Sequence, residues 1–350
     1  MEMNLPAKAA IVILNYNTQH QLEQFLPNII ETAKKSKLPV YVADNFSTDN
    51  SISFLEINYP EVHCIALDKN YGFAEGYNQA LQQVAAEYFI LMNSDIKADV
   101  QSFYEIIEFM DQNQEVAACQ PKILSHSKPE YFEYAGGAGG FIDWLGYPFC
   151  KGRIFDITEK DHGQYNQTGS VFWASGAAFF VRSKLFNEFG GFDGSYFAHA
   201  EEIDLCWRLK RAGYHIYTYP EVSVYHVGGG TLNYNSPFKT YLNFRNTLST
   251  IFKNESSSLV FLKVLMRLVL DGAAAGLFLI QGNFKGILAI IHAHWHFFVH
   301  LPHHYRTRKN TSENIEKNRI GPSTVGEGLF DKSIVWHFYF LRKKYFSQLI

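Results

Sequence analysis

Short apolar runs alternate with amphipathic stretches through the first third of the chain. The apolar runs lie at residues 10–14, 40–43, 63–67, 88–92 and 116–120. The amphipathic stretches between them lie at residues 20–35, 75–86 and 100–113. Strands that alternate with helices are typical of a parallel sheet whose faces are covered by helices. We therefore predict an open α/β sheet that binds its ligands beyond the carboxyl ends of the strands.

Polar residues follow four of these predicted strands at the point where each strand ends. They are Asn15, Asn17, Asp44, Asn45, Asn70, Asn93, Ser94 and Asp95. A polar residue after one strand is an ordinary loop residue, but the carboxyl ends of parallel strands meet at one edge of a sheet. The repetition therefore predicts a single crevice lined by these side chains.

The phosphate-binding loops of common nucleotide enzymes are absent from the sequence. It has no GxxxxGK(S/T) loop and no GxGxxG turn after the first strand, which argues against P-loop phosphoryl transfer and dinucleotide-dependent dehydrogenation. A bound nucleotide would then need a metal ion to neutralise its phosphates. Mg²⁺ and Mn²⁺ accept one or two carboxylates together with phosphate oxygens, so Asp95 is a candidate ligand. Spacing alone leaves open that Asp95 instead caps a helix near Asp99 or closes a turn.

Asp44 closes the second predicted strand in the stretch VYVADNFSTDNS. A carboxylate at this position could accept hydrogen bonds from a base or a ribose. The alternative is a local interaction in which the carboxylate stabilises its own turn. The polar neighbours at the same edge favour the ligand interpretation.

Two adjacent glutamates open a predicted helix in the stretch HAEEIDLCWRLKRAG. Glu201 and Glu202 fall in its first turn, where the helix dipole favours the ionised state that a general base requires. Asp204 and Arg208 are four residues apart and are predicted to pair on one face. Acidic residues at a helix start can also be simple dipole partners, but Trp207 indicates a mostly buried helix whose acidic end faces a ligand.

His226 ends a predicted strand directly before three glycines, Gly228, Gly229 and Gly230. A single histidine is more often a packing or surface residue than a metal ligand. A glycine run, however, supplies backbone amides that can close over phosphates beside the imidazole. We therefore take His226 as a second candidate metal ligand.

The second half of the chain changes character twice. Residues 125–170 are rich in Gly and Tyr and read as an irregular insertion, and beyond residue 250 the chain becomes long and helical. Lys263, Arg267 and Asp271 recur every four residues in an apolar helix, so they form one polar stripe. Such a helix lies in a membrane interface or packs on a protein surface. The later histidines, at positions 292, 294, 296, 300, 303 and 304, are expected to form a weakly basic patch near anionic headgroups rather than a zinc site.

Composition adds constraints on location and partners. The formal net charge is −3, so nothing in the overall charge indicates nucleic acid binding. The four cysteines show no CxxC spacing, which fits a reducing compartment. The short apolar run near the N-terminus reads as a strand and not as a signal peptide. We therefore expect a cytoplasmic protein, with the membrane surface as a candidate contact of the C-terminal helices.

Several of these stretches occur together in a known family. The sequence resembles the family 2 glycosyltransferases, in particular their bacterial rhamnosyltransferase-like branch, over about residues 8–250. The motifs are VILNYN, VADNFSTDNS, NYGFAEGYNQAL, LMNSDI, SGAAFFVRSKLFNEFGGFD, FAHAEEIDLCWRLKRAGY and VYHVGGGT. The resemblance implies the A-type glycosyltransferase fold, an α/β fold with a Rossmann-like nucleotide-binding sheet. It divides the chain into a catalytic domain, residues 1–250, and a helical C-terminal extension, residues 251–350, which is a candidate for membrane contact.

The resemblance also implies roles for individual residues. Asp44 would contact the nucleoside, and Asp95 would fill the last place of the family's metal-binding DxD triplet, which reads Asn-Ser-Asp here. Glu202 falls on the position of the catalytic base, with Glu201 beside it, and His226 would join the metal. The remaining residues implied to bind the nucleotide sugar are Asn15, Asn17, Asn45, Asn70, Gly76, Asn78, Asn93, Ser94, Gly176, Asp204, Gly229 and Gly230.

The function implied is inverting transfer of a hexose or deoxyhexose, such as rhamnose, in the synthesis of a cell-surface polysaccharide. The donor would be a nucleotide-diphosphate sugar, the acceptor a hydroxyl of a glycan or lipid-linked sugar, and the cofactor Mg²⁺ or Mn²⁺. Two alternatives stay open. One is a nucleotidyltransferase. The other is a catalytically silent scaffold that binds a nucleotide sugar, which the missing first carboxylate of the triplet allows.

Overall fold

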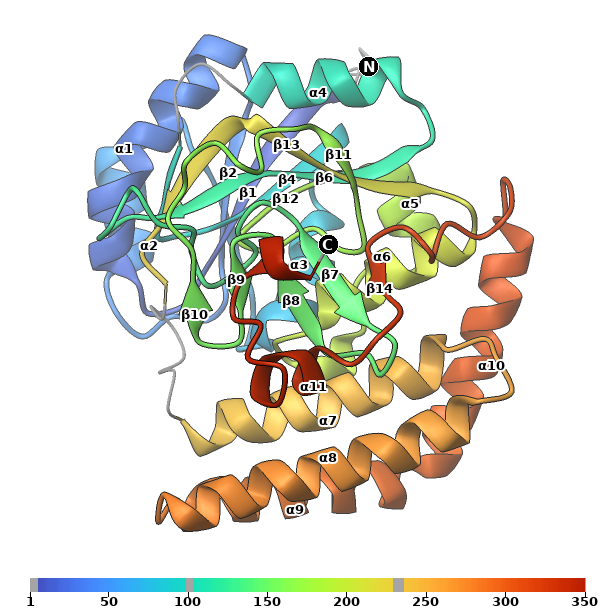
Figure 1. Cartoon of the computed structure of the whole chain (residues 1–350). Helices are drawn as coiled ribbons and strands as arrows, with labels where there is room; N and C mark the ends of the chain where they lie inside the picture. The colour runs from blue at the N-terminus through green and yellow to red at the C-terminus, as the bar shows by residue number, and fades with distance from the viewer. Residues whose placement is uncertain (1–5, 99–102, 229–235, 350) are drawn as a thin grey trace.

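The computed structural model describes residues 6–98, 103–228 and 236–349, and its central feature is a nine-stranded sheet (Figure 1). The strand order is β11-β13-β6-β12-β4-β1-β2-β3, with β5 paired to β13. The strands are β1 (Ala7–Asn15), β2 (Val40–Asp44), β3 (His63–Ala66), β4 (Ala86–Asn93), β5 (Ile96–Ala98), β6 (Val116–Ser125), β11 (Gly169–Val171), β12 (Ala178–Arg182) and β13 (His215–His226). Strands β4, β1, β2 and β3 run parallel, as predicted. Strand β12 is antiparallel to both β4 and β6 and so separates the two halves of the sheet.

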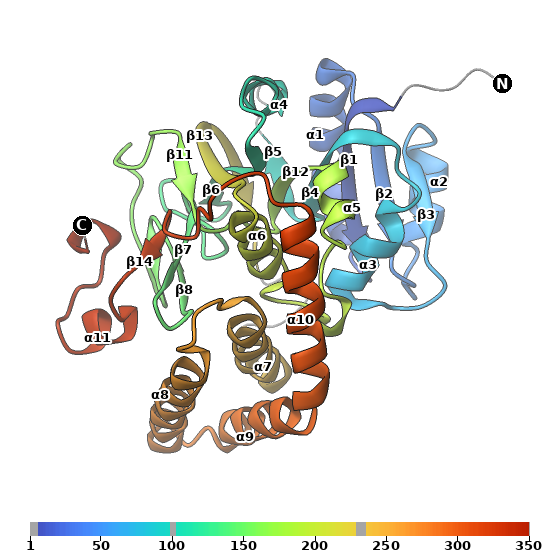
Figure 2. The ribbon, with the colours of Figure 1, turned by 90° about the vertical axis from the view of Figure 1, so that its right-hand side faces the viewer.

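Helices cover both faces of the sheet. They are α1 (Gln19–Ser36), α2 (Ser51–Asn58), α3 (Gly72–Leu81), α4 (Phe103–Gln112), α5 (Ser183–Glu188) and α6 (Glu201–Arg211). One hydrophobic cluster packs α1, α2 and α4 on one face, and a second packs α3, α5 and α6 on the other (Figure 2). The helix predicted at residues 75–86 is shifted, because α3 begins at Gly72 and Ala86 already opens β4. The start of α3 is set by a tertiary contact, since the amides of Phe73 and Ala74 donate to the carbonyl of Phe197.

The insertion expected to be irregular contains a second sheet. Its order is β10 (Ile157–Thr158), β9 (Arg153–Ile154), β8 (Pro148–Cys150), β7 (Gly140–Asp143) and β14 (Leu329–Phe330). The expectation was wrong here because strands of two to four residues are too short to carry a periodic pattern. Strand β14 comes from the end of the chain and pairs with β7. Residues of the following helix α11 (Ile334–Tyr339) pack into the same small core.

The C-terminal helices lie below the sheet in two layers, except that the last of them rises beside α6. They are α7 (Pro237–Asn254), α8 (Val260–Ile280), α9 (Phe284–Val299) and α10 (Leu301–Lys317). Helix α7 lies between α6 and the outer pair α8 and α9 (Figures 1 and 2). Helix α7 spans residue 250, so the helical region begins at Pro237 and the expected boundary falls inside a helix. No helix of the described residues is both long and apolar enough to span a membrane.

The polar stripe of α8 faces the protein, and the apolar side of the helix faces outward. Arg267 and Asp271 are buried. The Tyr147 hydroxyl donates to Asp271 at 3.2 Å, the Arg267 guanidinium stacks on the Tyr147 ring at 3.6 Å, and His294 of α9 lies 3.1 Å from Asp271. These charges hold α8 against the insertion and α9. The side left exposed consists of large apolar residues, among them Leu265, Val269 and Ile280.

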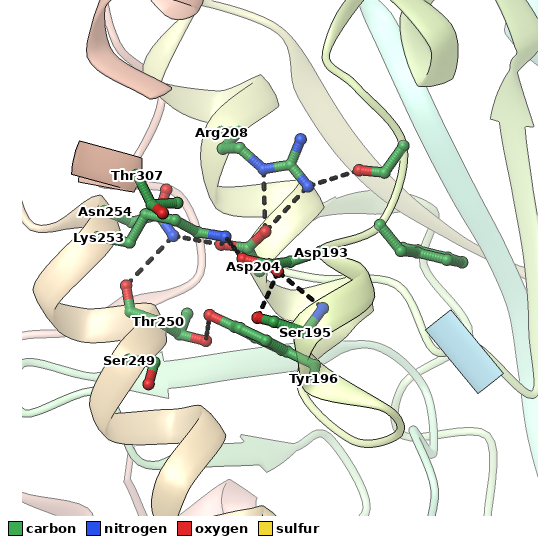
Figure 3. A network of polar contacts seen from close by, with 12 residues as sticks. Asp193, Ser195, Tyr196, Asp204, Arg208, Ser249, Thr250, Lys253, Asn254 and Thr307 are labelled. Carbon is green, nitrogen blue, oxygen red and sulfur yellow. Dashed lines mark hydrogen bonds and ion pairs between the residues drawn. The ribbon is translucent and has the colours of Figure 1, made fainter. Parts of the chain in front are cut away.

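A buried ionic network joins α6 to α7 (Figure 3). Asp204 has no exposed surface. It accepts hydrogen bonds from Arg208 Nε at 2.9 Å and from Asn254 Nδ2 at 2.7 Å, and Lys253 Nζ lies 2.8 Å away. Lys253 also pairs with Asp193. The predicted pair of Asp204 and Arg208 is confirmed. Both oxygens of Asp204 contact side chains of α6 and α7, and its expected contact with the nucleotide sugar stays a prediction.

The segment that leads into α6 has an unusual backbone. Phe197, His199 and Ala200 have φ angles of 64°, 71° and 69°. These angles lie in the left-handed region, which residues other than glycine adopt at a cost of about 1–3 kcal/mol each. Such a conformation persists only where its surroundings impose it. Ala200 directly precedes Glu201, so this segment sets the direction in which α6 begins.

Helix α7 imposes this conformation through two side chains. The Asn246 side-chain nitrogen lies 3.0, 2.8 and 2.7 Å from the carbonyl oxygens of Tyr196, Ala198 and His199. Arg245 donates from Nη2 to the carbonyls of Ser195 and Tyr196. Asn246 is fully buried, so water does not replace these bonds. The strained segment is therefore held from α7.

Replacing Asn246 tests this dependence. We expect Asn246→Ala to lower the free energy of unfolding by about 1–3 kcal/mol, because it leaves buried carbonyls without a donor. Asn243→Ala is the matched control: Asn243 is exposed on the same helix, so its loss should change the free energy by less than about 0.5 kcal/mol. Urea denaturation measures both. Equal stability of the two variants would show that α7 does not impose the conformation.

Candidate active site

Asn15 and Asp44 connect the carboxyl ends of β1 and β2. Asn15 donates from Nδ2 to Asp44 Oδ1 at 2.8 Å, and the backbone amide of Ser47 donates to Asp44 Oδ2 at 2.9 Å. Both side chains are buried. The turn interaction considered from the sequence is therefore present. It fixes the edge of the sheet where the predicted crevice lies.

The other amide side chains of this edge shape its loops. Asn17 accepts from the backbone of Thr48 at 2.7 Å. Asn45 donates to Asn70 Oδ1 at 3.2 Å and to the Gly72 carbonyl at 2.9 Å. These bonds hold the β1, β2 and β3 loops in one arrangement.

Two residues of α3 fit the helix closely to its neighbours. Asn78 exchanges two hydrogen bonds of 2.9 Å with the backbone of Phe192, so its amide is occupied within the protein. A Cβ at Gly76 would come within 3.0 Å of Leu14 and 3.2 Å of Asn45. Glycine is therefore needed at this position for the close approach of α3 to β1.

The triplet after β4 places its three side chains in different directions. Ser94 donates to Gln21 Oε1 of α1 at 3.1 Å. Asp95 Oδ1 lies 3.1 Å from His226 Nε2, and Asp95 Oδ2 accepts from the Gly228 amide. Asn93 Nδ2 lies 3.2 Å from the same histidine nitrogen. The two candidate metal ligands are thus adjacent, because β5 pairs with the end of β13.

Glu133 completes this cluster, and sequence reasoning missed it. Its Oε2 lies 3.2 Å from His226 Nδ1 on the side opposite Asp95. Burial lowers the pKa of His226, but hydrogen bonding and the charges of the two carboxylates outweigh burial and raise it to about 10. Burial likewise opposes ionisation of Asp95, yet His226 holds the Asp95 pKa below its usual value. Without a ligand, His226 is therefore a protonated partner of two carboxylates.

The chemistry of this cluster fits a divalent cation. His226 Nδ1 is buried and makes no well-formed hydrogen bond, and carboxylate and imidazole donors suit Mn²⁺ and Mg²⁺. Within residues 6–98, 103–228 and 236–349, no three His, Cys, Asp or Glu side chains are arranged to hold a metal by themselves. An ion held by Asp95 and His226 would therefore need phosphate oxygens to complete its coordination and would displace the histidine proton. Gly229 and Gly230 lie outside the described residues.

The two glutamates at the start of α6 have different environments. Glu201 is buried, and burial together with the neighbouring Glu202 raises its pKa well above the usual value. Glu202 is partly exposed. Burial raises its pKa to about 7, although the amides of Gly176 and Ile203 favour its ionised form. Its Oε2 is buried and has no hydrogen-bond partner in the part of the chain that the structure describes. Glu202 is thus the carboxylate that changes charge near neutral pH.

A short turn before β12 connects the glutamates to the Asp95 cluster. The Gly176 amide bonds to Glu202, and a Cβ at Gly176 would lie 4.0 Å from the Glu202 carboxyl carbon. The next residue, Ala177, accepts a hydrogen bond of 3.1 Å from the Asn93 amide. Glu202 and the Asp95 cluster therefore border one continuous edge.

His199 is a second functional candidate that sequence reasoning did not single out. Burial, with a smaller contribution from Lys239, lowers its pKa to about 4, so the imidazole is neutral. Its Nε2 is buried without a hydrogen-bond partner. The signal available in the sequence was its place two residues before Glu201. Glu133 offered no such signal, because it lies in the insertion.

The sequence and fold both match known proteins. Residues 10–190, more than half of the chain, match the family described as Glycosyl transferase family 2. The chain is 25% identical over 234 residues to N-acetylglucosaminyl-diphospho-decaprenol L-rhamnosyltransferase of Mycobacterium tuberculosis. The aligned region covers 62% of this chain and 75% of that protein.

Two solved structures share the fold at low sequence identity. S. aureus TarS 1-349 in complex with UDP-GlcNAc superposes with a TM-score of 0.55 and 15% identity over 89% of each chain. GalNAc-T7 with UDP, GalNAc and Mn²⁺ gives a TM-score of 0.55 and 14% identity. The aligned region covers 72% of this chain and about half of that protein. With the observed sheet, these likenesses confirm the predicted A-type glycosyltransferase fold. The chain belongs to glycosyl transferase family 2, a family of glycosyltransferase enzymes.

Proposed function

We propose that the protein transfers a sugar from a nucleotide-diphosphate sugar to a hydroxyl of a lipid-linked or glycan acceptor, with inversion at the anomeric carbon. The observation that carries the proposal is Glu202. Glu202 is a partly exposed residue whose carboxyl group has a pKa of about 7, and its buried Oε2 has no hydrogen-bond partner among the described residues, on the same edge as Asp95 and His226. Family membership supports the reaction class, and the name of the M. tuberculosis relative supports a lipid-linked diphosphate acceptor.

The proposed reaction is a single displacement. Glu202 takes the proton of the acceptor hydroxyl as its oxygen forms a bond to the anomeric carbon. The bond from that carbon to the diphosphate breaks, and its electron pair leaves with the nucleoside diphosphate. Asp44 and Asn15 frame the nucleoside side of the crevice. A divalent ion held by Asp95 and His226 would neutralise the charge that develops on the diphosphate.

The environment of Glu202 suits a base at neutral pH. A base is most effective when its pKa lies near the working pH. Burial beside Glu202 raises the pKa of Glu201 well above its usual value, which disfavours a second negative charge at the site. Because the pKa of Glu202 is raised, its protonated form is a weaker acid and holds the proton that it takes from the acceptor hydroxyl.

Removing the carboxylate of Glu202 tests the base. We expect Glu202→Gln to lower kcat by about 10²–10⁴-fold, the usual contribution of a general base, with nucleotide affinity unchanged. In the native enzyme, kcat/KM should fall as pH drops below about 7, because the base becomes protonated. Glu201→Gln is the control and should retain most of the activity, since burial favours the neutral form of Glu201. Full turnover by Glu202→Gln would place the base elsewhere.

Nucleotide titration tests the donor site. We expect one of UDP, dTDP and GDP to bind in a calorimeter with Mn²⁺ present, and binding to weaken strongly without the metal or in Asp95→Ala. The physical reason is that Asp95 and the metal together offset the diphosphate charge. Binding without any turnover would favour the silent scaffold, and binding of none of the three would contradict the donor site.

We further propose that the outer helix pair docks on a membrane surface. The large apolar residues exposed on α8 and α9 are Phe261, Leu262, Leu265, Val269, Leu277, Leu279, Ile280, Phe284, Leu288, Ile291, Trp295, Phe298 and Val299. Ile280, at the turn between the helices, is 84% exposed. An exposed apolar area of this extent marks an interaction site. A lipid surface would bring a membrane-bound acceptor to the enzyme.

Vesicle sedimentation tests the docking. We expect the double substitution Ile280→Ser and Phe284→Ser to reduce binding to phosphatidylglycerol vesicles by about tenfold or more, because each side chain loses the free energy of apolar burial. Ile57→Ser is the control, since Ile57 is an equally exposed apolar residue on α2. Unchanged sedimentation of the double variant would remove this face from membrane contact.

A further inference from the structure

A strip of aromatic and basic side chains runs from the strained segment before α6 to the outer face of α9. We call it the histidine strip. Its members are Phe238, Tyr241 and Arg245 of α7, His292 and His296 of α9, and His300, which caps the end of α9. The strip begins where the Phe238 ring meets the Phe197 ring, with centroids 5.7 Å apart.

Ring contacts continue along the strip without a break. Tyr241 lies 6.2 Å from Phe238, 6.1 Å from His292 and 6.2 Å from His296, measured between ring centroids. His296 and His300 stack with centroids 4.0 Å apart. The strip thus joins the segment that precedes α6, and with it the proposed base Glu202, to α9.

The basic groups of the strip have no acidic partner among the described residues. Among the described residues, no carboxylate forms an ion pair with Arg245, His292, His296 or His300. The pKa of His296 is lowered to about 4 by burial and then by His300, Arg245 and His292, all of them basic. Its Nδ1 is also buried without a hydrogen-bond partner. A group of basic side chains that lacks a neighbouring negative charge is complementary to an anion.

An apolar stripe lies directly beside these histidines on α9. Leu288, Ile291, Trp295 and Val299 recur every three or four residues, so they share one face, and all are exposed. His292, His296 and His300 occupy the adjacent stripe, one residue further around the helix. A ligand that suits both stripes has an anionic head and an apolar chain.

We propose that the histidine strip binds the diphosphate of a lipid-linked acceptor. The apolar chain lies on the exposed stripe of α9, and the acceptor sugar extends past Phe238 toward Glu202. The proposal rests on the proposed transferase function and names the acceptor's head group as its recognised feature. A diphosphate fits better than a neutral head group, because the Arg245 guanidinium is positively charged and a bound anion favours protonation of the neighbouring imidazoles, which then donate charge-assisted hydrogen bonds to phosphate oxygens.

Binding of a short isoprenoid diphosphate tests the proposal without donor or turnover. We expect the protein to bind farnesyl diphosphate in a calorimeter, and to bind farnesol and inorganic diphosphate at least about tenfold more weakly, because each lacks one half of the interaction. The double variant His292→Ala and His300→Ala should weaken farnesyl diphosphate binding by about tenfold or more. His303→Ala, an exposed histidine on α10 outside the strip, is the control.

Two further measurements distinguish binding at the histidine strip from binding at the donor site and at the membrane-docking face. Farnesyl diphosphate should bind Asp95→Ala as it binds the native protein, because the donor site is not involved. The double variant should keep its binding to phosphatidylglycerol vesicles. The proposal is overturned if the double variant binds farnesyl diphosphate normally, if Asp95→Ala abolishes that binding, or if vesicle binding falls in parallel. A Glu202→Gln variant that retained turnover would overturn the proposed base and leave these binding results unchanged.

Discussion

Asp204 is a fully buried carboxylate, and the need to neutralise it organises the lower half of the molecule. A buried charge is stable only when it is paired and hydrogen-bonded. Asp204 finds its partners in Arg208 on its own helix and in Lys253 and Asn254 at the end of α7. These contacts fix the position of α7 against α6. Because α7 is fixed there, Asn246 meets the carbonyls before Glu201 and holds a backbone that would otherwise relax.

The two ends of the candidate site differ in the direction in which the protein shifts the pKa values of their carboxyl groups. At the start of α6, burial without a cation raises the pKa values of Glu201 and Glu202. At the end of β4, Asp95 is also buried, but His226 lowers its pKa. One end therefore binds a proton near neutral pH, and the other keeps a fixed negative charge beside a cation. Proton transfer and phosphate binding need these two different environments on one edge.

The outer helices reverse the usual arrangement of an amphipathic helix. Arg267 and Asp271 of α8 are buried, where the Arg267 guanidinium stacks on Tyr147 and Asp271 contacts Tyr147 and His294, and the apolar side faces outward. A helix in water normally buries its apolar side, so this arrangement requires another apolar phase or partner. The histidine strip lies where that face meets α7. The fold thus places an apolar surface, a basic strip and the proposed base in sequence along α9, α7 and α6.

The alternation of strands and helices along the chain, the carboxyl-edge residues and the acidic start of α6 could be predicted from the sequence, because each depends on local periodicity or on a strand end. The contact between Asp95 and His226 depends on the pairing of β5 with β13. The contact between Glu133 and His226 depends on an insertion whose strands are too short to show a pattern. Periodicity found the polar stripe of α8 but not its direction. Spacing reports which residues share a face. Only tertiary contacts decide whether that face turns to the protein or to its surroundings, because burial and charge pairing depend on residues far apart in the chain.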